Sequence, residues 1–408
     1  MLRFASAPTD SMRLEDLRIA LFNYIIAKQR KEPFIIRIED ANIENQEGSD
    51  AKVVAFLELF GIKYQDILYQ SKSVRFHQTM AFDLLSRKKA FNCFCKTTKS
   101  PYDGSCENLP AEVVIDNPNP FRVRMKKPTS SIVFTDKIKA KVEYSKEEID
   151  SFEILHVDKT PTTVFANGID DMLNDISFIV LEERFMDDTP KHIHIREQLG
   201  YTKEIEYAHI PPIVLNEDID VKKLLEDGFL PESISNYLIL IGNKTPTEIF
   251  TLEEAIQWFE IKDIANSPTS FDMDHLRKIN REHLKRLEDK ELSRFVGFAD
   301  SDIGKFAKLF LNEVSTTKEL KEKIKPLFEP KQIPQSLQED AKILQKIVQN
   351  APFMDSYELF EAYILEHSNI SKENLLTLLR IFLVVQNEDI PLKDAYEALK
   401  NYIVEVMK

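Results

Sequence analysis

Residues 2–40 read LRFASAPTDSMRLEDLRIALFNYIIAKQRKEPFIIRIED, and the architecture of the chain's first half follows from their pattern. Residues 2–5 form a short apolar run, residues 6–12 form a polar loop, and from 13 to about 30 apolar side chains recur at helical spacing. A second apolar run covers residues 34–38 and ends in two acidic residues. The pattern predicts a strand–loop–helix–strand unit, with which nucleotide-binding α/β domains begin. In such a unit the loop and the helix N-terminus offer free backbone N–H groups to a phosphate.

Composition narrows the class of protein. A chain of 408 residues is long enough for about two to three domains, and 43% hydrophobic residues suffice for packed cores. No run of about 18 apolar residues occurs and the first strand begins at once, so we expect a cytoplasmic protein without a signal segment or a membrane partner. Three cysteines fit a reducing compartment. Because the net charge is −14, any contact with RNA must come from a local basic patch. We also expect a monomer without a DNA partner.

Three motifs in the first 40 residues carry a resemblance to a known family. RFASAPTDSMRLEDLR at 3–18, ALFNY at 20–24 and IRIED at 36–40 resemble the start of bacterial glutamyl-tRNA synthetases, which are class I synthetases. The family writes its loop as Ser-Pro-Thr-Gly, followed by His-(Ile/Val)-Gly. In this chain Asp10 stands for the loop Gly, Arg13 for the catalytic His and Glu15 for the helix Gly. The framework matches, and the chemistry of the first signature is degenerate.

The three replacements are expected to weaken ATP binding. In the family, the His donates to the ATP phosphates and the helix Gly lets the adenine approach the backbone. Glu15 adds a side chain where close approach is needed. Glu15 and Asp16 also place carboxylates in the first helical turn, where they complement the positive helix end that otherwise would hold an anion. The alternative is a family member with a relaxed motif that still binds ATP.

This chain departs further from the family at the second signature motif. YAHIPPIVL at 207–215 resembles the strand that leads into the family's Lys-Met-Ser-Lys loop, which clamps the triphosphate in the transition state. After Asn216 the chain carries Glu217, Asp218 and Asp220 and passes directly into a predicted helix. We therefore predict that the second signature loop is absent and that an acidic turn replaces a basic one. Removing a single donor to transition-state charge typically costs on the order of 10²–10³ in rate.

The resemblance also locates an amino-acid pocket. Arg3 and Glu39 remain from the family's pocket, and we expect them to form a salt bridge. The family Tyr that helps to hold glutamate is Thr163 here. The family Arg that grips the substrate's side-chain carboxylate is Leu181, or Val180 if the alignment shifts by one residue. Neither side chain can replace a guanidinium fork.

A candidate metal site lies between the two signatures. Cys93-Phe-Cys95 is followed by Tyr102 and Cys106, which resembles the Cys-x-Cys…Tyr-x-x-x-Cys zinc pattern of some glutamyl-tRNA synthetases and of their short tRNA-modifying paralogues. Zinc takes four ligands in a tetrahedron and thiolates suit it. We expect a structural Zn²⁺ at these four residues. The alternative is a set of reduced thiols left from an ancestral site.

Basic residues at two places are candidates for tRNA contact. Arg122 and Arg124, with the two lysines at 126–127, would make a basic edge for a phosphate backbone, or an edge strand protected by charge. Arg277, Arg281 and Lys285 are spaced i, i+4, i+8 in a segment that resembles the family's stem-contact helix. They would follow tRNA phosphates, or they form a solvated helix face.

The fold class expected is an α/β Rossmann-like nucleotide-binding domain with an α+β insertion, followed by an all-α C-terminal half. The predicted boundaries are 1–69 with 149–215 for the nucleotide-binding domain, 70–148 for the inserted acceptor-binding subdomain, 216–290 for a helical stem-contact domain and 291–408 for a helical part resembling an anticodon-binding domain.

Three functions fit these observations. The favoured hypothesis is a glutamyl-tRNA synthetase paralogue that keeps tRNA binding and has lost or strongly reduced aminoacylation. The second is a working glutamate–tRNA ligase with a divergent site, which would need ATP and Mg²⁺. The third is a protein-binding scaffold that binds no RNA. The helical C-terminal half argues against the third, because a relic without an RNA role need not keep it.

Overall fold

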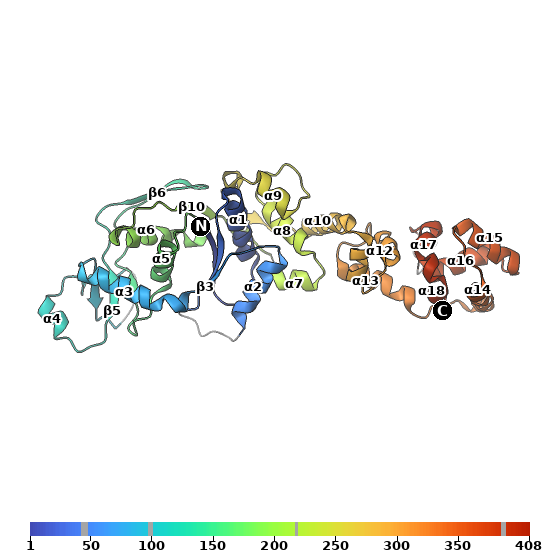
Figure 1. Cartoon of the computed structure of the whole chain (residues 1–408), viewed down its shortest axis with the longest axis horizontal. Helices are drawn as coiled ribbons and strands as arrows, with labels where there is room; N and C mark the ends of the chain where they lie inside the picture. Colours follow the sequence, from blue (N-terminus) through green and yellow to red (C-terminus); the bar gives the residue numbers. More distant parts are fainter. Residues whose placement is uncertain (42–47, 97–100, 217–218, 385–388) are drawn as a thin grey trace. The chain divides into compact units, whose positions relative to one another are not determined.

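The computed structural model describes the whole chain except residues 42–47, 97–100, 217–218 and 385–388 (Figure 1). The chain divides into two compact units: residues 1–222 together with 235–271, and residues 223–234 together with 272–408. The first unit holds the strands, and the second is helical. No helix within the described ranges is long and apolar enough to cross a bilayer.

A seven-stranded sheet forms the centre of the first unit, in the order β3-β2-β1-β9-β10-β6-β7. β1 and β2 pair in parallel from Leu2 opposite Phe34 to Ser6 opposite Ile38, which confirms the two predicted strands. The last pair, β6 and β7, is an antiparallel hairpin that extends an otherwise parallel sheet. The strands are β1 (Leu2–Ser6), β2 (Phe34–Ile38), β3 (Ile67–Tyr69), β6 (Ile132–Asp136), β7 (Ala140–Tyr144), β9 (Phe178–Glu182) and β10 (Glu206–Ile210).

Helices cover both faces of this sheet. α1 (Leu14–Arg30) confirms the predicted helix and packs against β1 and β9 on one face. α5 (Thr163–Leu173) and α6 (Thr189–Gln198) pack together on the other face (Figure 1). α1 is buried along most of its length because its apolar side chains occupy several of its faces, and it ends where Lys31 adopts a left-handed conformation. The remaining helices of this unit are α2 (Ser49–Leu59), α3 (Val74–Ser86), α4 (Ala111–Ile115) and α9 (Leu252–Trp258).

A smaller antiparallel sheet carries the candidate metal residues. Its order is β4 (Ala90–Cys93), β5 (Arg122–Met125) and β8 (Glu153–Leu155), so β5 is the central strand. Val123 and Met125 of β5 are fully buried against α3 and α5. A further two-stranded pair joins β11 (Ile213–Val214) to β12 (Thr269–Ser270).

The second unit is built from amphipathic helices around one apolar core. Local capping fixes several helix starts: Asp272 caps α10, and Thr316 and Glu319 form a capping box at α13. Asp300 caps α12, which stops at Lys308. The elements are α7 (Val221–Glu226) and α8 (Pro231–Leu240), which span the unit boundary, then α10 (Met273–Arg286), α11 (Asp289–Phe295), α12 (Ser301–Lys308), α13 (Thr317–Ile324), α14 (Gln338–Asn350), α15 (Tyr357–His367), α16 (Lys372–Leu383), α17 (Leu392–Leu399) and α18 (Ile403–Val406). A mostly parallel α/β core followed by a helical half confirms the predicted fold class.

Candidate functional site

The turn between β1 and α1 is closed by its own side chains. The Arg13 guanidinium, directly before α1, holds both carboxylate oxygens of Asp16 at 2.7 and 3.0 Å. The same group lies 2.6 Å from a carboxylate oxygen of Glu182, which ends β9 and is largely buried. Hydrogen bonding to Asp16 raises the pKa of Arg13 further above its ordinary value. The cation of the first signature is therefore held by two carboxylates.

The chain after β11 lies against the same turn. Asp220 forms an antiparallel backbone bridge with Arg13, and the Val221 N–H donates to the Met12 carbonyl at 3.0 Å. Glu217 and Asp218, predicted to make the acidic turn, lie outside the described residues. The predicted start of a helix after this turn is confirmed by α7. Asp220 and Val221 are thus joined to the first signature turn by backbone hydrogen bonding.

Asp10 and Glu15 place further negative charge here. The Asp10 carboxylate accepts from Lys52 Nζ at 2.8 Å and from Ser49 Oγ at 3.0 Å, and the bond from Lys52 lowers the pKa of Asp10. Glu15 is half-buried in the first turn of α1, as predicted. The N-cap residue Arg13 makes no side-chain capping bond, so the first turn relies on the acidic charges for electrostatic compensation.

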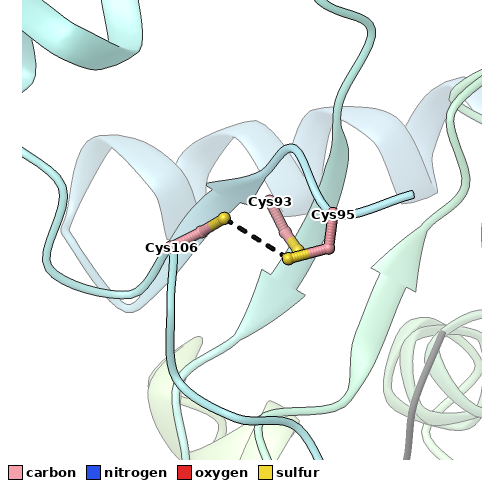
Figure 2. Close-up of side chains that lie close together, drawn as sticks. All are labelled: Cys93, Cys95 and Cys106. Carbon is pink, nitrogen blue, oxygen red and sulfur yellow. Dashed lines mark hydrogen bonds between the residues drawn. The ribbon is translucent and has the colours of Figure 1, made fainter. Parts of the chain in front are cut away.

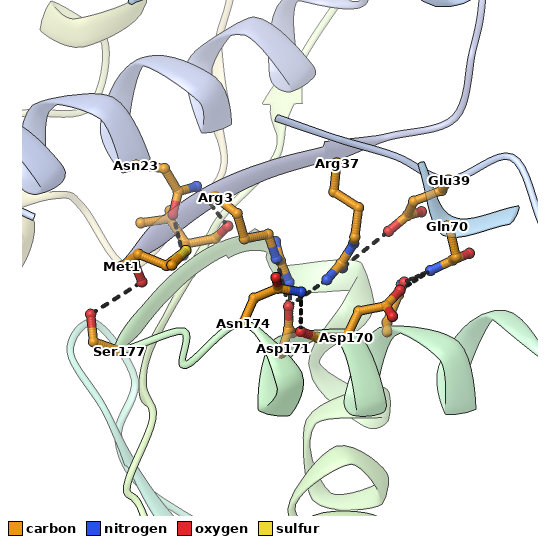
Figure 3. A network of polar contacts seen from close by, with 12 residues as sticks. Met1, Arg3, Asn23, Arg37, Glu39, Gln70, Asp170, Asp171, Asn174 and Ser177 are labelled. Carbon is orange, nitrogen blue, oxygen red and sulfur yellow. Dashed lines mark hydrogen bonds and ion pairs between the residues drawn. The ribbon is translucent and has the colours of Figure 1, made fainter. Parts of the chain in front are cut away.

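The expected salt bridge between Arg3 and Glu39 is wrong. Arg3 instead makes two hydrogen bonds to Asp171 of α5, at 2.9 and 3.0 Å, and Arg37 reaches the same carboxylate at 2.6 Å (Figure 3). Glu39 lies 3.4 Å from Arg37. The physical reason is burial: the Asp171 side chain is 0% exposed, and a buried carboxylate needs close cationic partners. Burial alone would raise the pKa of Asp171, but the two arginines bring it well below its usual range.

The positions expected to hold the substrate's carboxylate carry no cation. Val180 and Leu181 lie in β9, and Val180 is fully buried. Thr163 is the first residue of α5 and is exposed. Beside the Asp171 cluster, His192 is buried, and burial lowers its pKa to about 4, so its ring is neutral at physiological pH. Arg3 is the remaining cation of the predicted amino-acid pocket, and both hydrogen bonds of its guanidinium group go to Asp171.

The three cysteines of the candidate metal site converge. Cys93 ends β4, and a turn through Gly104, at φ +79°, returns the chain to Cys106. The three sulfur atoms lie within 4.8 Å of one another, with Cys95 Sγ 3.6 Å from Cys106 Sγ (Figure 2). Tetrahedral zinc with bonds of about 2.3 Å would separate thiolate sulfurs by roughly 3.8 Å, so the spacing suits that ion.

Tyr102 lies beside the thiols. Its hydroxyl is 3.8 Å from Cys93 Sγ and accepts the Cys106 backbone N–H at 2.7 Å. Burial raises the pKa of the Tyr102 phenol, so it stays protonated at neutral pH unless a cation draws the proton away. The predicted four-residue set is therefore brought together, with three thiols in ligand positions and the phenol at the rim.

Arg122 and Arg124 turn inward. Arg124 is 4% exposed, donates to the Ser151 carbonyl at 2.7 Å and lies 4.4 Å from the centre of the Tyr102 ring. Arg122 lies 3.6 Å from Glu153. The alternative that this segment is a charge-protected edge strand is wrong, because β5 pairs with β4 on one side and with β8 on the other.

The predicted basic face of α10 is largely occupied by contacts within the second unit. Arg277 pairs with Glu319 at 2.7 Å, and Arg281 donates to the Val314 carbonyl and to Ser315 Oγ. Lys285 keeps a 41% exposed side chain and pairs with Glu282, one turn earlier. Of these three residues, Lys285 presents the most accessible charge.

Two features were not found from sequence. One is the Asp171 cluster, of which only Arg3 was singled out in the sequence. The other is a cavity of about 590 Å³ with lysines around it, of which only the pair at 126–127 stood out in the sequence. Its remaining lysines, Lys88, Lys89 and Lys146, come from two other segments.

Comparisons with known proteins bear on this arrangement. The family model described as "tRNA synthetases class I (E and Q), catalytic domain" matches residues 1–278. The chain is 47% identical to glutamate–tRNA ligase 2 of Sulfurimonas denitrificans and 42% identical to glutamate–tRNA ligase 2 of a Sulfurovum species, each across 100% of both chains. Among solved structures, the glutamate tRNA ligase of Elizabethkingia meningosepticum superposes with a TM-score of 0.81 at 20% identity, covering 99% of this chain and 97% of that one.

Proposed function

We propose a function for a chain that belongs to the class I tRNA synthetases of the glutamate and glutamine branch: it binds tRNA, but has lost most or all of its capacity to activate glutamate. The observation that carries the proposal is the closure of the first signature turn. Arg13 is bound by Asp16 and Glu182, and its backbone is bridged to Asp220. Phosphates would have to compete with these contacts for the Arg13 guanidinium.

The reaction develops negative charge that the site would have to stabilise. Formation of an aminoacyl adenylate from ATP, with Mg²⁺ bound to the nucleotide, passes through a highly charged phosphoryl transition state that preorganised donors stabilise. Here Arg13 is paired with Asp16 and Glu182, and Glu182 also pairs with Arg184 at 2.9 Å. The Asp10 carboxylate at the loop is paired with Lys52. Charge-assisted bonds between a guanidinium and carboxylates are among the stronger hydrogen bonds in proteins, so their displacement by ATP is unfavourable.

The amino-acid side of the site supports the same proposal. The Arg3 fork is held by Asp171 inside the protein, where exchange for a substrate carboxylate would leave Asp171 without one of its two arginines. Leu181 and Val180 offer no donor in place of the family's carboxylate-binding Arg. A free glutamate would find neither of the two cationic forks that the family provides.

The proposal keeps tRNA as the partner. We assign residues 1–69 and 149–215 to the catalytic-type domain, 70–148 to an acceptor-binding insertion, 216–290 to stem contact and 291–408 to an anticodon-binding type of domain. Zn²⁺ held by Cys93, Cys95, Cys106 and Tyr102 would stabilise the turn of the insertion. The protein acts as a cytoplasmic monomer in this account.

A second candidate is an active glutamate–tRNA ligase. It is favoured by the curated relatives, which carry that name and match at 41–47% identity over the full length of both chains. In this case other residues of the chain would have to hold ATP and Mg²⁺, since the signature positions are occupied as described.

Glutamate-dependent exchange of pyrophosphate into ATP, measured with and without purified tRNA, separates the two. Both arms are needed because tRNA is required for amino-acid activation by some enzymes of this kind. We expect no exchange above background in either arm, together with salt-sensitive binding of tRNA in a mobility-shift titration. Exchange that depends on glutamate would establish the ligase. Silence in both assays would indicate a protein-binding scaffold and contradict both candidates.

A further inference from the structure

A cationic pocket lies at the last turn of α6, on a chain whose net charge is −14. Lys88 and Lys89 enter it from the end of α3, Lys126 and Lys127 from the end of β5, and Lys146 from the segment after β7. Its volume of about 590 Å³ falls within the range of small-ligand sites. We call it the five-lysine pocket. Glu107 and Glu147 also line it, so five lysines stand against two carboxylates. A concave surface with an excess of positive charge attracts anions.

Most of these lysines form no ion pair with a carboxylate among the described residues. Among the described residues, Lys88, Lys89, Lys126 and Lys127 pair with no carboxylate, and Lys146 has a single exposed neighbour, Glu147, at 3.8 Å. Lys88 and Lys89 follow the C-terminus of α3, where a cation is favoured by the helix dipole, and this explains their presence in part. Lys126, Lys127 and Lys146 follow strands and have no such reason to gather.

The backbone at the pocket is fixed. The Lys126 N–H donates to the Lys89 carbonyl at 3.0 Å, which joins two of the three contributing segments. The buried ring of His194 places Nε2 2.8 Å from the Lys126 carbonyl, and because a carbonyl only accepts, this nitrogen carries the proton. Lys126 is thus held from both sides, while its side chain stays free to reach a ligand.

The lining indicates the chemistry of the ligand. Lysine is a flexible point charge that suits phosphate, whereas planar carboxylates favour the guanidinium fork of Arg. Phe, Tyr and Trp are absent from the lining residues, so the pocket offers no ring on which a base would stack. Several lysines around one cavity match phosphate groups that are linked to one another, as in the backbone of RNA or in an inorganic oligophosphate.

The pocket is separate from the signature turn. α6 begins after the carboxyl end of β9, where Glu182 meets Arg13, and it ends before β10 returns to the amino end of the sheet. Ten helical residues place these points about 15 Å apart. A ligand in the five-lysine pocket therefore does not occupy the position of ATP.

We propose that the five-lysine pocket binds linked phosphate groups, with the phosphodiester backbone of tRNA as their source. The choice of RNA as the source rests on the proposed function, and the binding of linked phosphates does not. Free oligophosphate is the other source with the same chemistry, and the two arms of the test tell them apart.

The test uses the full chain and two matched double variants. Lys126→Gln/Lys127→Gln removes two charges from the pocket, and Lys141→Gln/Lys262→Gln removes two well-exposed charges elsewhere in the first unit. Inorganic tripolyphosphate is titrated by calorimetry, and tRNA is titrated by mobility shift at several NaCl concentrations. We expect the pocket variant to lose at least tenfold in tripolyphosphate affinity and to lower the salt slope of tRNA binding by about 1.4–1.8, because each of the two lost phosphate contacts removes about 0.7–0.9. The control variant keeps both values.

The outcomes separate this inference from the proposed function. If the two variants have equal affinity for tripolyphosphate and equal salt slopes for tRNA binding, the proposal that the pocket binds linked phosphates is wrong. This holds whatever the affinity of the wild-type chain for tRNA. If tripolyphosphate binding depends on the pocket and the chain binds no tRNA, the phosphate site is supported with free oligophosphate as its ligand. The same result would contradict the proposed tRNA-binding function. A change in the tRNA slope alone supports the pocket with RNA as the source. If the pocket variant fails to fold, Lys88→Gln/Lys89→Gln replaces it in both arms.

Discussion

Replacing Asp171 by Asn tests whether the buried cluster holds the first unit together. The Asp171 carboxylate is 0% exposed and receives Arg3 and Arg37, whose side chains are 4% and 3% exposed. Asp171→Asn keeps the shape and removes the charge, which leaves two buried guanidinium groups with Glu39, 3.4 Å from Arg37, as the nearest remaining anion. Removing one partner of a buried ion pair costs about 3–5 kcal/mol in stability. That is a large fraction of the roughly 5–15 kcal/mol by which folded domains are stable.

The assay is urea unfolding followed by tryptophan fluorescence. Trp258 is the single tryptophan of the chain, lies in the first unit and packs edge-on against Phe250, with the ring centres 4.9 Å apart, so its signal reports on that unit. The control is Asp175→Asn, which removes an exposed carboxylate paired with Lys203 and is expected to leave the midpoint almost unchanged. Equal midpoints for wild type and Asp171→Asn would refute the importance of the cluster.

The pH dependence gives a second check with a defined sign. The folded-state pKa of Asp171 is lowered, so its contribution is fully present above the unfolded value of 3.8 and is lost as the pH falls. The stability difference between wild type and Asp171→Asn should therefore be constant at neutral pH and should narrow by about 1 kcal/mol on acidification to pH 3. A difference that widens on acidification would contradict the assigned charge state.

Three further predictions concern the other sites. Asp10→Gly/Arg13→His/Glu15→Gly, which restores the family's first signature, should not produce glutamate-dependent exchange, because we also predict the second signature loop to be absent; exchange by this variant would contradict that prediction. Metal analysis of the purified protein should find one zinc per chain, and Cys106→Ser should reduce it severalfold; equal zinc in both would refute the site. Gly304→Ala should lower the thermal midpoint, since a Cβ there would lie 1.7 Å from a backbone carbonyl of α11, and such overpacking costs about 1–3 kcal/mol; an unchanged midpoint by calorimetry would show that the contact can relax.

Local pattern predicted those parts of the fold that local physics determines. β1, α1 and β2 could be read from residues 2–38 because apolar spacing alone distinguishes strand from helix there. The cysteines came together as predicted, since a span of 14 residues with a glycine turn leaves few ways to arrange them. Local pattern could not show which sheet β6 and β7 join, because that depends on the pairing of β6 with β10, about 70 residues away.

The partners of buried side chains were harder to predict, as the pairing of Arg3 with Asp171 in place of Glu39 shows. The chain has 68 acidic residues, and Asp171 is 168 positions from Arg3 in sequence. Sequence could place both arginines on neighbouring strands, but only the packing of α5 on the sheet decides which carboxylate is buried between them. The same holds for the five-lysine pocket, whose lysines come from three separate segments.

Single-turnover charging of tRNA tests the central claim most directly. The full chain, in excess over purified tRNA, is mixed with ATP, Mg²⁺ and labelled glutamate, and an active glutamate–tRNA ligase serves as the positive control under the same conditions. A mobility shift on the same tRNA establishes that complex has formed. We predict that tRNA is bound while charging stays at the level of the enzyme-free reaction. Charging of the bound tRNA at a rate close to that of the control ligase would contradict the account.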